Sequence, residues 1–123
     1  MNARVARIPL REAPEEGAVR MVEIGGRRIG VYRVAGRFHA LADRCPHRGA
    51  PLCSGKLTTP VEIREGELTA GTSHSVVRCP WHKWEFEIAT GRSLADHRLR
   101  ARSYAVHVDE QHLVVSLDRP LGD

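Results

Sequence analysis

The sequence predicts an all-β fold, an antiparallel sandwich or barrel, and three observations lead to it. Short β-rich segments recur along the 123 residues, separated by turns that contain glycine or proline. No segment shows a convincing helical periodicity, and no repeat or low-complexity stretch is present. The length suits a single domain, residues 1–123, with a modest core and little room for a second domain carrying its own active site.

The first half of the chain predicts an antiparallel meander. Residues 4–10 have the pattern of a strand that Pro9 interrupts, and the polar residues 11–17 follow as a loop. A meander with short, glycine-containing turns comes next. Its three predicted strands are residues 19–24, 28–34 and 38–42.

The second half of the chain predicts further short strands. Residues 84–88 alternate between apolar and acidic side chains, which is the pattern of a half-buried strand. The segment 94–102 is irregular and basic, with a single helical turn at 96–99. The other predicted elements are a small hairpin at 61–68, a strand at 75–78, and a closing hairpin formed by 104–108 and 113–117.

Two loops that follow predicted strands carry the candidate chemistry. Each offers one thiol and one imidazole, which are one residue apart in the first loop and two residues apart in the second. A proline after each cysteine stiffens the loop, and a glycine in the first loop permits close backbone approach to a bound group. The loops read Cys45-Pro46-His47-Arg48-Gly49-Ala50-Pro51-Leu52 and Cys79-Pro80-Trp81-His82-Lys83-Trp84.

Two cysteines and two histidines form a donor set that suits either zinc or an iron–sulfur cluster. Zinc fingers usually pair cysteine with cysteine and histidine with histidine. A mixed pair in each loop instead favours a cluster of two irons, in which the cysteines share one iron and the histidines share the other. Backbone N–H groups that point at sulfur are expected to stabilise the added negative charge of the reduced state. A structural zinc module is the less favoured alternative.

The paired loops resemble the cluster motif of Rieske-type [2Fe–2S] proteins. The similarity continues through Trp84-Glu85-Phe86 and Thr90-Gly91 and extends to the meander and the closing hairpin. Within this group, the chain is similar to the ferredoxins of bacterial oxygenase systems and to the Rieske domains of ring-hydroxylating oxygenases. The resemblance implies a [2Fe–2S] cluster in a cluster-binding subdomain at about residues 43–91. It implies these ligands: Cys45 and Cys79 on one iron, and His47 and His82 on the other, with an exposed imidazole edge as the exit for electrons.

The chain departs from the respiratory and photosynthetic Rieske proteins at four positions. Those proteins have a disulfide between the two loops, where this chain has Ala50 and Trp81. They also place hydroxyl donors, a serine and a tyrosine, where this chain has Trp84 and Phe86. Fewer donors to sulfur stabilise the reduced state less, so we expect a reduction potential near the lower end of the Rieske range, about −150 mV.

Three further features have no settled role in the sequence. Lys83 stands where the family commonly has glycine, either as a constraint and cation at the loop tip or as an ordinary solvated lysine. The segment 55–77 is long for the family and is either a hairpin that recognises a partner or a tolerated surface insertion. Cys53 has no evident mate and is expected to be a small buried side chain.

Composition limits the classes of partner and the compartment. Nineteen basic residues against fifteen acidic ones either favour an acidic protein partner or are ordinary surface charge. The arginines are scattered along the sequence without a nucleic-acid motif, so no nucleic acid is expected. No apolar run approaches the roughly 20 residues that span a bilayer. No signal peptide is recognisable at the N-terminus, so a cytoplasmic location without a membrane partner is the expectation.

Together these features predict a one-electron carrier and not an enzyme. Four protein ligands saturate both irons and leave no position open for a substrate. The remaining histidines, at positions 39, 74, 97, 107 and 112, do not form a second iron site with a carboxylate. The expected partners are a reductase and a terminal oxygenase or similar oxidoreductase, with the carrier itself a monomer. The alternative is a Rieske-like small subunit of a larger oxidoreductase, of the nitrite reductase type.

Overall fold

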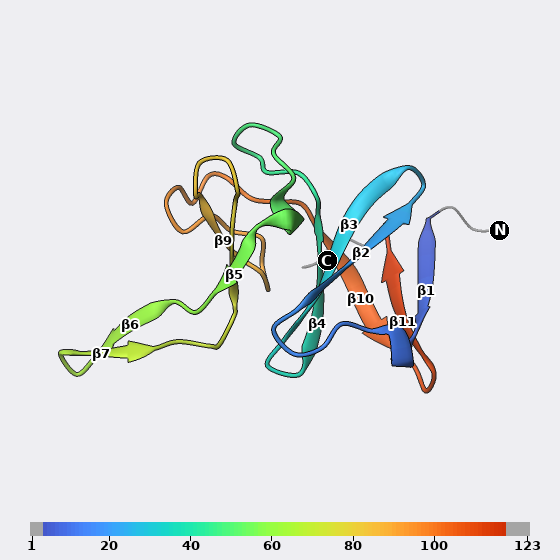
Figure 1. Ribbon diagram of the computed structural model, residues 1–123, viewed down its shortest axis with the longest axis horizontal. Coiled ribbons are helices and arrows are strands. Elements are labelled where there is room, and N and C mark those ends of the chain that lie inside the picture. The colour runs from blue at the N-terminus through green and yellow to red at the C-terminus, as the bar shows by residue number, and fades with distance from the viewer. Residues whose placement is uncertain (1–3, 118–123) are drawn as a thin grey trace.

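This computed structural model describes residues 4–117, whose regular elements are short strands and two 3₁₀ turns joined by loops (Figure 1). The expected helical turn at 96–99 is only a hydrogen-bonded turn, in which the Leu99 N–H donates to the Asp96 carbonyl. Within 4–117, no helix has the length and apolar character of a membrane span. The elements are β1 (Val5–Pro9), η1 (Leu10–Glu12), β2 (Val19–Ile24), β3 (Arg27–Val34), β4 (Arg37–Ala42), η2 (Leu52–Ser54), β5 (Lys56–Thr58), β6 (Val61–Arg64), β7 (Glu67–Ala70), β8 (Val76–Arg78), β9 (Glu85–Glu87), β10 (Ser103–Val108) and β11 (His112–Ser116).

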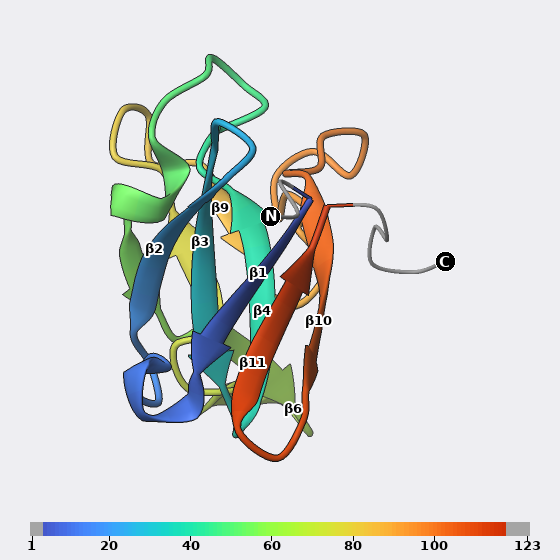
Figure 2. The same ribbon diagram turned by 90° about the vertical axis from the view of Figure 1, so that its right-hand side faces the viewer.

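The largest sheet confirms the all-β prediction. Its six antiparallel strands run in the order β1-β11-β10-β4-β3-β2. The edge strands β1 and β2 contact each other, so the sheet nearly closes into a barrel (Figure 2). Pro9 ends β1 at this edge of the sheet, where a missing backbone N–H is tolerated.

The turns of the meander explain why its strand boundaries were predicted to within one residue. Gly25 and Gly26 between β2 and β3 have φ of +56° and +81°. Ala35 and Gly36 between β3 and β4 have φ of +51° and +76°. Two successive left-handed residues make the hairpin turn whose twist matches that of paired strands.

Strand β3 is buried on both faces and joins two cores. Ile29 and Val31 pack into the barrel core, which is formed with strands β1, β10 and β11. Tyr32 and Val34 point the other way, into a second core that includes both loop cysteines. Packing on the outer face of β3 therefore fixes the ligand loops to the barrel.

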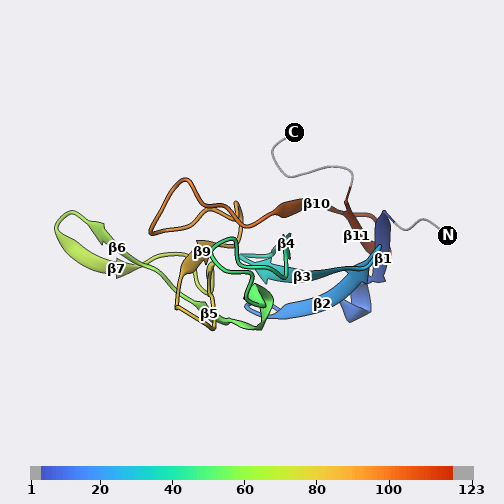
Figure 3. The ribbon, with the colours of Figure 1, turned by 90° about the horizontal axis from the view of Figure 1, so that it is seen from above.

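Two smaller sheets lie within the long segment between the ligand loops and just after it. A three-stranded sheet has the order β5-β8-β9, and β6 pairs with β7 as the small hairpin that the sequence predicted. The hairpin extends away from the body of the molecule, as Figure 3 shows from above. Its apolar side chains Val61, Ile63 and Leu68 are 70%, 74% and 75% exposed. They form an apolar face with no core of its own.

Candidate metal centre

Both ligand loops lie at the same end of the molecule. The first loop follows β4 and the second follows β8, so each loop starts at the end of a strand that belongs to a sheet (Figures 1 and 2). The two strands belong to different sheets, which the second core joins. The four donor residues that the sequence singled out are thus brought together from two distant segments.

The two loops share one pattern of backbone hydrogen bonds. In each, the cysteine N–H donates to the carbonyl five residues later, and the N–H four residues later donates back to the cysteine carbonyl. The loops are therefore two copies of one turn, although their histidines occupy different positions in it. The bonds are Cys45 N–H to Ala50 O (2.8 Å), Gly49 N–H to Cys45 O (2.7 Å), Cys79 N–H to Trp84 O (2.7 Å) and Lys83 N–H to Cys79 O (3.0 Å).

Lys83 occupies the position in the second loop that Gly49 occupies in the first. Both residues are in the left-handed region, with φ of +77° at Gly49 and +59° at Lys83. A side chain in this region is strained by its own Cβ, and glycine is not. The loop geometry therefore favours glycine here, and Lys83 is exposed and strained.

Replacing Lys83 with glycine is expected to raise the free energy of unfolding by about 1 kcal/mol, because the left-handed strain is removed. For a domain of this size the thermal midpoint should rise by about 4 °C. A Lys83→Gln variant removes the charge but keeps the strain and should leave the midpoint unchanged. The reciprocal variant Gly49→Lys should lower the thermal midpoint. A lower midpoint for Lys83→Gly than for wild type would contradict the explanation by left-handed strain.

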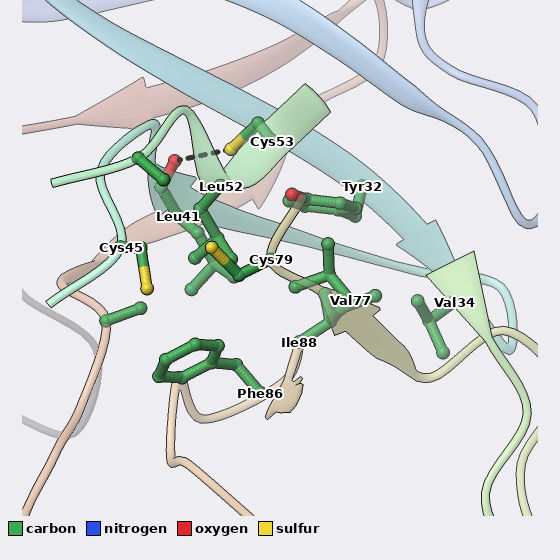
Figure 4. Packing of buried hydrophobic residues seen from close by; sticks show 12 residues of the cluster. Tyr32, Val34, Leu41, Cys45, Leu52, Cys53, Val77, Cys79, Phe86 and Ile88 are labelled. Carbon is green, nitrogen blue, oxygen red and sulfur yellow. Dashed lines mark hydrogen bonds between the residues drawn. The ribbon is translucent and has the colours of Figure 1, made fainter. Parts of the chain in front are cut away.

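The two loop cysteines are buried next to each other. Cys45 is 1% exposed and Cys79 is 2% exposed, and neither is in a disulfide. Figure 4 shows Phe86 packed beneath them. The pKa of the Cys45 thiol is raised above its ordinary value, mainly by burial and also by the neighbouring Cys79 thiol, while the backbone N–H groups of His47 and Arg48 partly oppose this shift.

The two loop histidines also form a pair. The ring centroids of His47 and His82 are 5.6 Å apart, and the rings are perpendicular. His82 is exposed, whereas His47 is half-buried beneath Trp84, whose ring stacks on it at 4.3 Å with an angle of 21° between the planes. The sequence identified Trp84 only as a missing hydroxyl donor, and its contact with His47 was not foreseen. Trp84 fixes the orientation of one candidate ligand.

This arrangement fits a two-iron group. Within residues 4–117, no three His, Cys, Asp or Glu side chains gather around one point as a single ion requires. The donors are instead a thiol pair beside an imidazole pair. Two thiolates on one iron and two imidazoles on the other are the donor set of a Rieske centre. The buried thiols would exclude water from one iron, and the exposed His82 would connect the other iron to the surface.

Cys53 lies in η2 and outside the candidate centre. It is 3% exposed, and its thiol faces the carbonyl oxygens of Leu41 at 3.6 Å and Ala42 at 3.8 Å (Figure 4). Burial raises the pKa of this thiol to about 12. Cys53 is therefore a protonated core residue, which confirms its expected role as a small buried side chain.

The other histidines lie outside the candidate centre. His97 and His107 are exposed, and His39 and His112 are half-buried. His74 is exposed and lies in a turn with φ of +54°, before the strand that leads to the second loop.

Asp43 is a positioning residue that the sequence did not reveal. Its side chain is 3% exposed and accepts hydrogen bonds from the Arg28 Nε at 3.1 Å and from the Cys53 N–H at 2.8 Å. These bonds join β3, the start of the first ligand loop and η2. A buried carboxylate is tolerated because both bonds compensate for its lost hydration.

Comparisons with known proteins agree with this geometry. The family model of the Rieske [2Fe–2S] domain matches residues 4–106. The ferredoxin component of the naphthalene 1,2-dioxygenase system of Pseudomonas aeruginosa is 30% identical over 111 residues, which are 89% of this chain and 91% of that protein. Apoptosis-inducing factor 3 of Homo sapiens is 40% identical over 77 residues, which are 63% of this chain but 10% of that protein. This chain thus spans about a tenth of the length of that relative.

A solved structure shares the fold. It is the complex of reduced oxygenase and oxidized ferredoxin in carbazole 1,9a-dioxygenase, and the match has a TM-score of 0.73 at 24% identity. It covers 98% of this chain and 99% of the matched chain.

Proposed function

Because the chain belongs to the Rieske [2Fe–2S] family, we propose that it is a one-electron carrier, a ferredoxin that receives an electron from a reductase and passes it to a terminal oxygenase. A Rieske domain implies a bound [2Fe–2S] cluster. The observation that carries the proposal is the pairing of two buried thiols with two imidazoles, one of them exposed. The names of the ferredoxin relatives support the role of an oxygenase component.

We assign Cys45, Cys79, His47 and His82 as the cluster ligands. When bound, the cluster supplies a site that holds one electron. The residues of the chain orient and shield this site. The buried cysteines exclude water from the cluster site, and Trp84 holds the His47 ring by stacking. The exposed His82 provides the short path by which an electron enters or leaves.

The organisation of the chain follows from the same proposal. Residues 43–91 act as the cluster-binding subdomain within the single domain 1–123. The carrier works as a monomer in the cytoplasm. A structural zinc module is not supported, because the family match implies a [2Fe–2S] cluster.

A second arrangement is favoured by the lengths of some relatives. The 4beta-methylsterol monooxygenase of Methylococcus capsulatus is 32% identical over 100 residues, which are 23% of that protein. In such a relative, the part that matches this chain is one segment of a larger oxidoreductase. This favours the alternative in which the chain is a small subunit of a larger oxidoreductase. Gel filtration after mixing with a candidate reductase would separate the two arrangements, because a free carrier elutes alone and a subunit co-elutes.

The decisive experiment is spectroscopy of the purified protein. A red-brown protein with about two irons and two sulfides per chain, and a low average g value in the EPR spectrum of its reduced form, is expected. Electron passage is then followed by stopped-flow absorbance, with the reductase and oxygenase components of a naphthalene dioxygenase system as probes. A colourless protein that contains one zinc would overturn the proposal.

The reduction potential is expected to be about −150 mV, at the lower end of the Rieske range. The reason is the absence of hydroxyl donors at Trp84 and Phe86, since Phe86 is fully buried beside the cysteines and Trp84 contacts His47. A spectroscopic redox titration measures the midpoint. A clearly positive midpoint would contradict this explanation.

A further inference from the structure

Arginines that are far apart in the sequence meet beside the first ligand loop. Strands β3, β4 and β10 are neighbours in the sheet, and their ends at the ligand-loop end of the molecule surround an open hollow of about 420 Å³. All four arginines of the hollow are exposed. Arginines that are scattered along the sequence are therefore neighbours in three dimensions. The hollow is lined by Arg27, Arg28, Ala42, Arg44, Arg102 and Tyr104.

Most of the charge in the arginine hollow is not neutralised. Arg28 pairs with Asp43, whose side chain is almost completely buried. For Arg27, Arg44 and Arg102, no carboxylate within the described range 4–117 lies at ion-pair distance. The three guanidinium groups thus remain available to an external anion.

The arginine hollow borders the candidate centre. Arg44 directly precedes Cys45, and its guanidinium lies 3.8 Å from the position that a Cβ on Gly49 would occupy. It therefore covers the backbone of the first ligand loop. Arg102 lies 5.6 Å from the centre of the Tyr104 ring, which holds this guanidinium at the wall of the hollow.

The opposite end of the molecule has a different charge arrangement. The β10–β11 turn and η1 lie there (Figure 2) and carry carboxylates that pair with nearby arginines. Arg7 pairs with Asp109 at 3.4 Å, and Arg20 pairs with Glu12 at 3.3 Å. Unpaired positive charge beside the ligand loops would orient an approaching acidic protein toward the electron exit.

We propose that the arginine hollow docks a carboxylate-rich surface segment of the protein that exchanges electrons with the cluster. This inference rests on the proposed function and names the chemistry of the partner. Guanidinium groups bind carboxylates through paired hydrogen bonds, which fix orientation as well as distance. Arg44 directly precedes Cys45 in the first ligand loop, so a partner docked in the hollow would lie beside the loop that carries His47. The His82 ring of the second loop is 5.6 Å from the His47 ring, centroid to centroid.

The test uses the cluster-loaded protein and a fluorescent peptide of ten glutamates, with binding measured by anisotropy at low ionic strength. Arg27→Glu/Arg102→Glu reverses two charges of the hollow without touching the ligand loops. Arg11→Glu/Arg37→Glu is the control for net charge, since both arginines are exposed and lie away from the hollow, and Arg11 differs from the hollow arginines in its contact with Glu12 at 3.9 Å. We expect the first variant to weaken binding about tenfold and the control much less. The affinity of the neutral variant Arg27→Gln/Arg102→Gln for the peptide should lie between that of wild type and that of the charge-reversal variant.

A second readout connects docking with electron transfer. Oxidation of the reduced protein by ferricyanide, an anion, should be slower in Arg27→Glu/Arg102→Glu than in wild type, and the peptide should inhibit it. Oxidation by a cationic cobalt complex should not be slower in this variant. Equal weakening in both double variants, or no binding of the peptide to wild type, would overturn the docking site. Iron content and reversible reduction at an electrode are measured for every variant. A protein that cycles electrons but ignores the peptide refutes only the docking site, and a protein without a cluster refutes the proposed function.

Discussion

Replacing Cys79 with alanine is expected to lower the iron content from about two per chain to near zero, because one iron loses one of its two thiolates. The same substitution at Cys53 should leave the iron in place. The two positions are well matched, since Cys79 is 2% exposed and Cys53 is 3% exposed. Iron and sulfide analysis of the two purified variants, with their visible spectra, measures the effect.

This comparison separates ligation from packing. Removing either thiol leaves a small cavity in the same core and costs about 1 kcal/mol of stability. Only the thiol of Cys79 lies beside another thiol, whereas that of Cys53 faces backbone carbonyls. A coloured Cys79→Ala protein, or a colourless Cys53→Ala protein, would show that the ligand assignment is wrong.

Replacing both loop histidines with cysteine is expected to lower the reduction potential by about 250 mV. The physical reason is charge: two neutral imidazoles become two thiolates, and the reduced state is then less favourable. Rieske centres reach down to about −150 mV, whereas plant-type clusters with four cysteines lie near −400 mV. Spectroscopic redox titration of His47→Cys/His82→Cys, with the cluster confirmed by iron analysis, measures the shift.

The control for this prediction is His74→Cys/His97→Cys, which changes the composition identically at two exposed histidines. Its potential should equal that of the wild type, with reductant present to keep the new thiols free. If the loop variant kept the wild-type potential and EPR spectrum, His47 and His82 could not both be ligands.

The sequence was sufficient for features that depend on neighbouring residues. The donor pairs lie within single loops, so their spacing alone favoured a two-iron cluster over a zinc finger. The meander was predicted because paired left-handed residues such as Gly25-Gly26 mark hairpin turns locally. Burial of β3 on both faces also follows from its own residues, with Ile29 and Val31 alternating out of phase with Tyr32 and Val34.

Features that depend on contacts between segments were missed. The stacking of Trp84 on His47 joins two loops, and no local pattern announces it. The sequence marked Lys83 as standing where the family has glycine, but its positive φ and its equivalence to Gly49 are seen only in the structure. The arginine hollow exists because the sheet places β10 beside β4 and β4 beside β3, an order that the spacing of arginines in the sequence does not contain.

The position of both imidazoles at one end of the molecule has a kinetic consequence. Because the His47 and His82 rings are only 5.6 Å apart, the donor and the acceptor of the proposed carrier would dock on the same face and would exclude each other. Every turnover of the proposed carrier would then include one dissociation and one new association. Docking that is too tight slows this shuttling, and docking that is too weak slows encounter. The rate of a coupled assay should therefore pass through a maximum as salt is added.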